Sequence, residues 1–302
     1  MIWDLIILPT ADNTLKNRKS MEHVKKPEWL KISIGTNARY TETKQIVDTH
    51  KLHTICSSGR CPNLGECWGR GTATFMIAGA ICTRACKFCN TLSGKPLSLD
   101  ADEPLHIAES VRLMKLDHAV ITSVDRDDLP DLGAAHWAET IREIKRLNPS
   151  TTIEALIPDF QGNVSLINMV TDTRPDIVSH NIETVRRITP LVRSVATYEC
   201  SLKVLKTIAE SGITAKSGLM VGLGETPEEV EQTMDDLLEA GCRILTIGQY
   251  LQPSRKHYPV AEYIHPDQFK LYKEIGEKKG FATVESGPLV RSSYHAEKHR
   301  HL

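Results

Sequence analysis

Short runs of aliphatic and β-branched residues alternate with longer segments of helical periodicity from residue 72 onward. The short runs lack the strict polar alternation of a sheet that has one face in solvent, so the strands they predict are buried on both faces. Such strands are typical of a parallel sheet covered by helices. Six of them are predicted, at residues 72–78, 119–124, 152–157, 177–182, 215–221 and 244–251.

The segments between these strands predict helices, at residues 104–115, 134–147, 163–171, 201–211 and 226–240. The last has the clearest ends, because Thr226 and Glu229 form a capping-box pattern, Pro227 occupies the first turn and Gly241 follows. Six βα units over about 200 residues predict an α/β fold, a partial (β/α)6 parallel barrel that lacks two of the eight units of a complete barrel. An open doubly wound sheet is the alternative, since sequence spacing does not separate the two.

The composition excludes several classes of protein. Of the 302 residues, 40% are hydrophobic and 25% are charged, which describes a globular chain with a sizeable core and not a disordered or fibrous one. Lys and Arg number 37 against 38 Asp and Glu, so no general charge attracts nucleic acid or an anionic membrane. No apolar run approaches the roughly 18–20 residues of a membrane span. We therefore expect a cytoplasmic protein with neither nucleic acid nor membrane as a partner.

Four segments are expected along the chain. Residues 1–25 are expected to form a disordered or wrongly assigned leader, and the first twenty of them precede the true start of translation, which we place at Met21. Residues 26–70 form an N-terminal extension, residues 71–286 the barrel and residues 287–302 a C-terminal tail. The apolar start lacks the basic region and the cleavage site of a signal peptide, so a reducing compartment is expected.

Six of the eight cysteines form two triplets, and their spacing indicates metal chemistry. The triplets are Cys56, Cys61 and Cys67, and Cys82, Cys86 and Cys89. Disulfides conflict with a reducing compartment, and three cysteines cannot all pair among themselves. Structural zinc prefers four ligands, whereas each triplet offers three. A 4Fe–4S cube bound by three thiolates keeps one iron with an open position, so iron–sulfur clusters are favoured. The remaining Cys200 and Cys242 are expected to be small buried hydrophobic residues.

The second triplet directly follows the first predicted strand, at the mouth of the predicted barrel. Its sequence is Cys82-Thr-Arg-Ala-Cys86-Lys-Phe-Cys89. This C-x3-C-x2-C spacing resembles that of the radical S-adenosylmethionine superfamily. The resemblance implies a 4Fe–4S cluster on these three thiolates, with its fourth iron chelated by the amino and carboxylate groups of S-adenosylmethionine and with Phe88 beside the cofactor. One electron from the cluster would then cleave the sulfonium and produce a 5′-deoxyadenosyl radical, which abstracts hydrogen from an unactivated carbon.

The first triplet narrows the resemblance. It stands in Cys56-Ser-Ser-Gly-Arg-Cys61-Pro-Asn-Leu-Gly-Glu-Cys67, and the chain ends close after Arg291-Ser-Ser-Tyr-His-Ala296. Together with the second triplet, these segments resemble the lipoyl synthase family over residues 26–295. The resemblance implies an auxiliary 4Fe–4S cluster held by the first triplet and by Ser293, whose harder oxygen is a weaker match for iron than a thiolate and can leave.

The resemblance also implies a reaction, that of a sulfurtransferase (EC 2.8.1.8). Two sulfur atoms would be inserted at carbons 6 and 8 of an octanoyl chain amide-linked to a lysine, and the auxiliary cluster would be the consumed sulfur donor. Two S-adenosylmethionine molecules would be used for each lipoyl group. The implied partners are octanoylated lipoyl carrier domains of 2-oxoacid dehydrogenase acyltransferase subunits and of the glycine cleavage carrier protein, and an electron donor such as flavodoxin or ferredoxin.

Polar residues at predicted strand ends are further candidates for cofactor binding. Asn181 and Glu183 lie in the segment that ends the fourth predicted strand, and similar segments of the family hold polar groups near S-adenosylmethionine. For Glu183 the alternative is a carboxylate that caps a following helix at Thr184. Thr122 and Ser123 end the second strand and could bond the amino acid part of the cofactor. Lys216 on the fifth strand is a weaker candidate for the cofactor carboxylate, because its burial would need a partner.

Two other classes of protein remain open on the sequence. One is a different radical S-adenosylmethionine enzyme: a biotin-synthase-like sulfur inserter, with auxiliary ligands inside the barrel, or a methylthiotransferase, which needs domains that 302 residues do not hold. The other is a non-catalytic iron–sulfur electron carrier or a zinc-binding adaptor. An adaptor needs neither six βα units nor Ser293, and a carrier has no use for an iron with an open position.

Overall fold

The computed structural model describes residues 25–30, 38–49, 53–59, 61–69, 74–293 and 296. The predictions of a leader and of a start at Met21 lie outside these residues. The described N-terminal elements are a 3-10 turn η1 (Glu28–Leu30) and helices α1 (Ala38–Thr49), α2 (Ile55–Ser58) and α3 (Leu64–Gly69).

Seven parallel strands form the main sheet, and their order in space is their order in the chain. They are β1 (Thr74–Ile77), β4 (His118–Ser123), β5 (Thr152–Leu156), β6 (Ile177–Ser179), β7 (Thr214–Val221), β8 (Ile244–Gln249) and β9 (Thr283–Gly287). A separate short pair, β2 (Ile81–Cys82) and β3 (Leu92–Ser93), belongs to the loop that follows β1.

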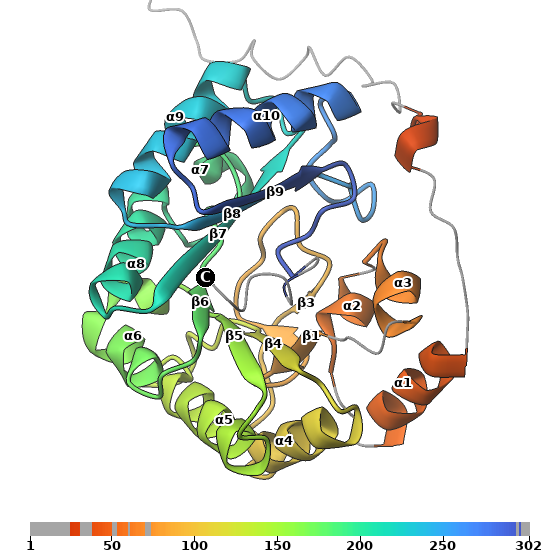
Figure 1. Cartoon of the computed structure of the whole chain (residues 1–302), viewed down its shortest axis with the longest axis vertical. Helices are drawn as coiled ribbons and strands as arrows, with labels where there is room; N and C mark the ends of the chain where they lie inside the picture. The colour runs from red at the N-terminus through yellow and green to blue at the C-terminus, as the bar shows by residue number, and fades with distance from the viewer. Residues whose placement is uncertain are drawn as a thin grey trace, which may run out of the picture.

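Helices cover the outside of this curved sheet, and Figure 1 shows it as a horseshoe whose opening faces the N-terminal helices. The covering elements are α4 (Glu103–Leu113), α5 (Ala134–Leu147), η2 (Phe160–Gly162), α6 (Val164–Thr171), α7 (Thr189–Val192), α8 (Tyr198–Glu210), α9 (Pro227–Glu239) and α10 (Pro266–Lys279). A doubly wound sheet would reverse its strand order and carry helices on both faces. The partial parallel barrel is therefore confirmed.

The structure adds a seventh unit, α10 and β9, to the six that the sequence predicted. Of the five residues of β9 only Val284 is buried, so this edge strand has no apolar run to mark it. The best-defined predicted helix is confirmed: the Thr226 side chain accepts from Glu229 N and the Glu229 carboxylate accepts from Thr226 N in a complete capping box.

The outer layer is apolar, whereas the barrel interior holds a buried ion pair. Trp137, Ile141 and Ile144 of α5 are fully buried against the sheet. Inside, Lys216 Nζ lies 2.8 Å from Glu154 Oε2, and Ser179 Oγ donates to Glu154 Oε1 at 3.1 Å. The prediction that Lys216 meets a cofactor carboxylate is wrong, because its buried charge is satisfied by Glu154 instead.

The N-terminal helices are joined to both edges of the barrel. Thr54 forms an antiparallel bridge with Phe75 of β1, and Met76 N donates to His53 O at 2.8 Å. Asn63 Nδ2 donates to Leu289 O, just after β9, also at 2.8 Å. The helices therefore span the opening between the first and the last strand of the sheet.

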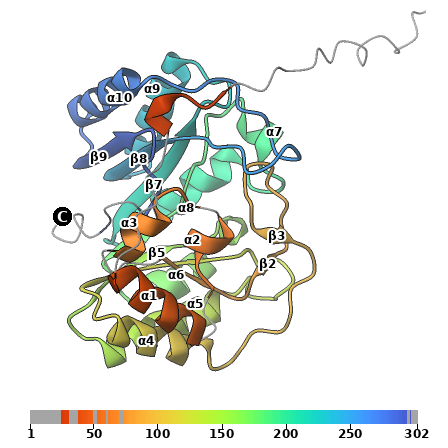
Figure 2. The same cartoon turned by 90° about the vertical axis from the view of Figure 1, so that its right-hand side faces the viewer.

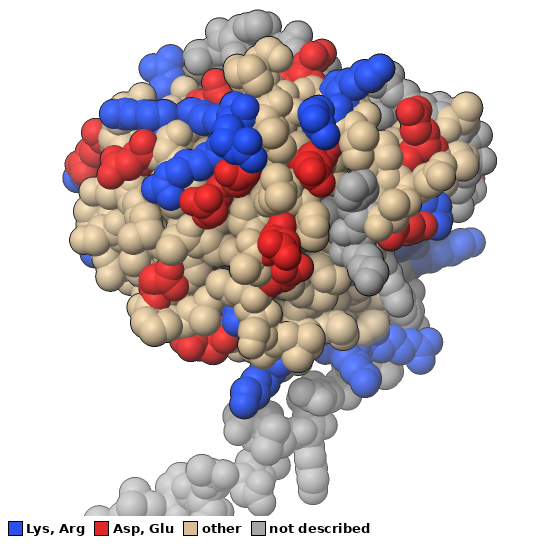
Figure 3. Space-filling model, turned by 90° about the horizontal axis from the view of Figure 1, so that it is seen from below, with Lys and Arg blue, Asp and Glu red and all other residues tan. Residues whose placement is uncertain are grey.

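The face of the molecule that includes α4 and α5 carries no dominant charge of one sign. In Figure 3, which shows this face, acidic and basic side chains are interspersed. None of the described helices is long and apolar enough to cross a membrane.

Candidate active site

Two neighbouring cavities lie at the carboxyl ends of the strands, where a parallel barrel carries its chemistry. The larger has a volume of about 450 Å³ and the smaller about 240 Å³. Phe88, Cys89, Asn181, Glu183 and Ser292 line both cavities. At this end of the barrel the loop of β2 and β3 lies beside the loop that follows β8, with Tyr258 N donating to Lys87 O at 2.8 Å (Figure 2).

The smaller cavity brings together all three cysteines of the second triplet, Cys82, Cys86 and Cys89. Cys82 Sγ accepts from the backbone N–H groups of Arg84 and Asp125, each at 3.4 Å. Cys86 Sγ lies 3.7 Å from Ser194 Oγ. Backbone and hydroxyl groups therefore already surround the sulfur atoms, as they do where thiolates bind iron.

A buried guanidinium holds this loop in place. Arg84, between the first two cysteines, bonds Asp159 through Nη1 at 2.9 Å and Nη2 at 2.8 Å. Its Nε and Nη2 each donate to Asp127 at 2.8 Å, and Asp125 lies 3.3 Å from Nη1. These carboxylates follow β4 and β5, so the arginine ties the cysteine loop to two strand ends. Despite burial, they raise the pKa of Arg84 and keep it charged.

Burial raises the pKa of Cys82 and of Cys89 in this cavity. For Cys82 burial and then the neighbouring Asp125 carboxylate raise the pKa to about 12. Burial likewise raises the pKa of Cys89. The metal-free thiols of Cys82 and Cys89 are therefore protonated near neutral pH, and metal ligation must release their protons.

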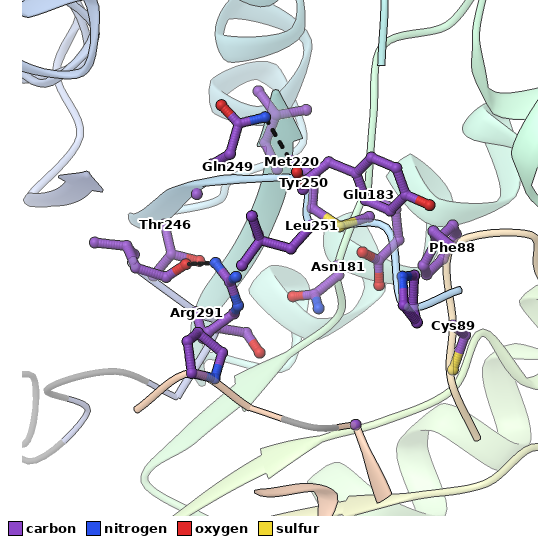
Figure 4. A pocket seen from close by; sticks show the side chains of 18 of the residues that line it. Phe88, Cys89, Asn181, Glu183, Met220, Thr246, Gln249, Tyr250, Leu251 and Arg291 are labelled. Carbon is purple, nitrogen blue, oxygen red and sulfur yellow. Dashed lines mark hydrogen bonds between the residues drawn. The ribbon is translucent and has the colours of Figure 1, made fainter. Parts of the chain in front are cut away.

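Asn181 and Glu183 lie where the two cavities meet, between the second triplet and the C-terminal segment (Figure 4). Asn181 Oδ1 is buried without a hydrogen-bond partner in the described structure. A Cβ on Gly218 would come within 2.6 Å of this oxygen, so only glycine leaves it room. Glu183 adopts φ 70°, a strained value for a bulky residue and one that occurs most often at functional sites.

The helix-cap alternative for Glu183 is wrong, because no helix begins at the next residue. The following helix, α7, has Ile188 at its N-cap and no side-chain cap. Burial raises the pKa of Glu183, and the nearby Arg193 opposes this rise. Glu183 therefore faces the cavities and not a helix terminus.

Thr122 and Ser123 line the smaller cavity, as expected, but both hydroxyls already have partners in the barrel. Thr122 Oγ1 donates to Leu156 O at 3.3 Å, and Ser123 Oγ accepts from Trp137 Nε1 at 3.1 Å. Each keeps a lone pair for a further donor. Phe88 lies with Cys89 on one side of the larger cavity.

The first triplet and the C-terminal segment also meet, and Thr74 is their common neighbour. Burial raises the pKa of the Cys56 thiol to about 11, although a bond from the Thr74 backbone lowers it. Cys61 N donates to Cys56 O at 3.0 Å, and the Cys61 and Cys67 thiols add to the rise in the pKa of Cys56. Thr74 Oγ1 donates to Ser293 Oγ at 2.9 Å. The first triplet and Ser293, which come from two separate segments, thus lie near the start of β1.

Sequence reasoning missed three arginines of this site. Arg84 stands inside the motif but was not assigned a part. Arg193 lines the smaller cavity and has a buried Nε without a partner in the part of the chain described. Arg291 lines the larger one. The residues next to Arg193 and Arg291 in the sequence do not predict that either arginine lines a cavity. Only the tertiary structure shows their positions.

The other two cysteines lie outside both cavities. Cys242 is buried, as predicted, and burial raises its pKa to about 12. Cys200 on α8 is only half-buried, so the prediction of a buried position is wrong for this residue: it stands in the first turn of the helix, where solvent reaches it.

Known sequences resemble this chain over almost its whole length. Residues 76–237 match the family model of the radical SAM superfamily. A lipoyl synthase of Phocaeicola vulgatus is 77% identical over 279 residues, which cover 92% of this chain and 98% of that relative. A lipoyl synthase of Treponema denticola is 58% identical over 275 residues, covering 91% and 95% of the two chains.

Solved structures share the fold at low sequence identity. Methylornithine synthase aligns with a TM-score of 0.53 and 10% identity, over 82% of this chain and 75% of that one. A maturase of the FeFe hydrogenase aligns with a TM-score of 0.53 and 14% identity, over 87% and 71% of the two chains. These likenesses show a shared fold, whereas the sequence relatives match 91–92% of this chain at 58–77% identity. The chain belongs to the lipoyl synthase family of the radical SAM superfamily.

Proposed function

We propose that this chain inserts two sulfur atoms, at carbons 6 and 8, into an octanoyl group carried on a protein lysine. As a member of its family the chain is a sulfurtransferase that uses a 4Fe–4S cluster and S-adenosylmethionine. One observation supports the finer proposal above all: a single cavity extends from one triplet to the other. Phe88 and Cys89 of the second triplet line one side of it, and Pro62, next to Cys61 of the first triplet, and Arg291 also line it. A substrate in this cavity would reach both.

The residues of the smaller cavity suit the first cluster and its cofactor. Among the described residues no group of His, Cys, Asp or Glu converges on one point that suits a single metal ion. A cube does not require such convergence, because each thiolate binds a different iron. Cys82, Cys86 and Cys89 would hold the cube. The partnerless Asn181 Oδ1 and Arg193 Nε, with Glu183, would bind S-adenosylmethionine, Arg193 through the carboxylate.

The donor set of Cys56, Cys61, Cys67 and Ser293 suits a second cube. Thr74 bonds both Ser293 and the Cys56 thiol, and Cys61 and Cys67 both affect the pKa of Cys56. The four residues come from the extension of residues 26–70 and the tail of residues 287–302. We propose that these two segments form one functional unit added to the barrel. When bound, the first cluster would supply one electron to each of two S-adenosylmethionine molecules in turn, and the second cluster would supply the sulfur.

The chain itself binds, orients and shields the substrate. Met220, Leu251 and Val290 line the larger cavity and offer apolar surface to an acyl chain. Each buried methylene contributes about 0.8 kcal/mol to binding. The walls keep water from a reactive carbon centre, and the mouth of the cavity sets which carbons reach each triplet. The octanoylated partner is a lipoyl carrier domain, and flavodoxin or ferredoxin would supply electrons. Free thiols suit a reducing compartment, the cytoplasm.

Anaerobic reconstitution tests this proposal. We expect about eight irons per chain, in two cubes. With dithionite and S-adenosylmethionine, the protein should form 5′-deoxyadenosine and increase the mass of an octanoylated carrier domain by two sulfur atoms. The matched control is the variant with alanine at Cys82, Cys86 and Cys89, which should keep the second cube and form no 5′-deoxyadenosine. Bound zinc in place of iron, or 5′-deoxyadenosine without sulfur transfer, would contradict the proposal.

A further inference from the structure

The side chain of Arg291 enters the larger cavity from the C-terminal segment, on the side opposite Phe88 and Cys89 (Figure 4). Its Nη1 donates to Val290 O at 2.6 Å. This contact to the preceding carbonyl directs the guanidinium back along its own chain and fixes it in the cavity wall. The arginine stands two residues before Ser293, so the same short segment brings a hydroxyl and a positive charge to the first triplet.

Arg84 and Arg291 both line a cavity but differ in their counter-charge. Arg84 bonds Asp127 and Asp159. Within the described ranges no carboxylate forms an ion pair with Arg291, and the same holds for Arg193 of the smaller cavity. Arg291 is partly buried, and a partly desolvated guanidinium without a carboxylate favours an anion nearby. The surroundings of Arg291 therefore suit an anion in the larger cavity.

Gly248 leaves the space that the Val290 carbonyl and the Arg291 guanidinium occupy. A Cβ on Gly248 of β8 would lie 2.1 Å from Val290 O and 3.2 Å from Arg291 Nη1. Any larger residue at position 248 would displace both the carbonyl and the side chain that bonds it. The location of Arg291 is thus specified by the barrel and is not that of an exposed side chain that happens to fold inward.

The anion available nearby is the first cysteine triplet. Arg291 belongs to the segment of Ser293, whose hydroxyl is held by Thr74 at the start of β1, and the next strand residue, Phe75, is bridged by Thr54 beside the triplet. Pro62, next to Cys61, lines the same cavity as Arg291. Three thiolates and a serine oxygen around an iron–sulfur cube carry net negative charge, which this buried location concentrates.

We propose that Arg291 is the counter-ion of the second cluster: its guanidinium compensates the negative charge of the cube and so raises the reduction potential of that cluster and secures it. This inference rests on the proposed function, because it requires the second cube. Arg291 is a positioning residue that acts on the cluster through charge. The alternative anion is a small carboxylate or phosphate from solution, which the experiment separates.

The experiment uses the full chain with Cys82, Cys86 and Cys89 changed to alanine, so that only the second cluster is measured. In this background Arg291→Gln removes the charge but keeps a donor for Val290 O, and Arg291→Lys keeps the charge. Arg112→Gln is the matched control, since Arg112 is exposed on α4 away from both cavities. The readouts are the midpoint potential of the cluster, followed by paramagnetic resonance, and the rate at which a ferrous chelator removes iron.

Arg291→Gln should shift the midpoint potential to more negative values and speed iron loss by about tenfold or more, because a buried charge loses its partner. Arg291→Lys and Arg112→Gln should stay close to the background protein. Equal midpoint potentials and equal rates of iron loss in all variants would overturn the proposal. The proposal would also fail if the background protein, in buffer without phosphate or acetate, showed the potential and the rate of the Arg291→Gln variant. If Arg291→Gln does not accumulate folded, Gly248→Ala displaces the same guanidinium and is measured in its place. A background protein without any cluster would instead contradict the proposed function.

Discussion

Thr74 and Ser293, which are 219 positions apart in the chain, are joined by a hydrogen bond of 2.9 Å between their hydroxyl groups. Thr74 is the first residue of β1, and its backbone also bonds the Cys56 thiol. One residue of the barrel thus holds a proposed ligand from each terminal segment. The relationship explains how a short tail becomes part of the same site as the N-terminal extension.

Changing Ser293 to Cys should preserve the second cluster and suppress sulfur transfer. A fourth thiolate binds iron more tightly than the harder serine oxygen and would not leave readily. The variant should contain as much iron as the unmodified chain, form 5′-deoxyadenosine and add no sulfur to an octanoylated carrier, as mass spectrometry would measure. Ser150→Cys adds a thiol at an exposed loop and serves as control. Full sulfur transfer by Ser293→Cys would contradict the role of the weak ligand.

Changing Gly218 to Ala should weaken S-adenosylmethionine binding. The new Cβ would lie 2.6 Å from Asn181 Oδ1 and 3.0 Å from Thr246 Oγ1, so the Asn181 side chain must move. Loss of one hydrogen bond of about 1 kcal/mol raises the Kd by roughly five- to tenfold. Isothermal titration with S-adenosylmethionine measures this change. Gly94→Ala, whose Cβ would meet only Ile81 at 3.6 Å, should leave the Kd unchanged, and an unchanged Kd in Gly218→Ala would exclude Asn181 as a contact.

Changing Arg84 to Met should destabilise the loop of the second triplet. The change leaves Asp127 and Asp159 without their cation, and breaking such a buried pair costs about 3–5 kcal/mol. Arg84→Lys should recover part of this loss, because an ammonium cannot reproduce the paired guanidinium bonds. Urea unfolding gives the free energies, and iron content gives the occupancy of the first cluster. The expectation fails if Arg84→Met retains both.

Stability should fall in acid as Glu154 is protonated. Burial alone would raise the pKa of this carboxyl, but Lys216 and His118 outweigh it and lower the pKa to about 2. Because the pKa in the folded chain lies below that in the unfolded chain, the stabilisation is complete above pH ~4.5 and is lost as pH falls toward 2. It amounts to about 3 kcal/mol.

Lys216→Met tests the same pair. Without the ammonium, burial dominates and the pKa of Glu154 should rise above its usual value, so the variant should lose about 3–5 kcal/mol at pH 7 and less at pH 4. Urea unfolding at the two pH values measures both. A variant whose deficit is equal at pH 7 and pH 4 would show that the pair does not set this pH dependence.

The βα alternation was sufficient to predict the barrel but not its last unit. Strands rich in aliphatic residues, such as β1 and β8, stand out because both of their faces are buried. The edge strand β9 has one neighbour in the sheet and one buried residue, so its local sequence resembles a loop. Pairing with β8 through Val284 and its neighbours makes it a strand.

Local sequence by itself determined the residue types of this protein's chemistry: two cysteine triplets with fixed spacing, Ser293 in the C-terminal segment, and the strands that carry polar ends. Tertiary structure alone decided which of these residues meet. It joined Ser293 to Cys56 through Thr74, satisfied Lys216 with Glu154, and left Arg291 in the cavity without a carboxylate from the described part of the chain. The physical reason is that chemical identity is a property of each residue, whereas charge compensation and ligand sets depend on contacts between residues far apart in the chain.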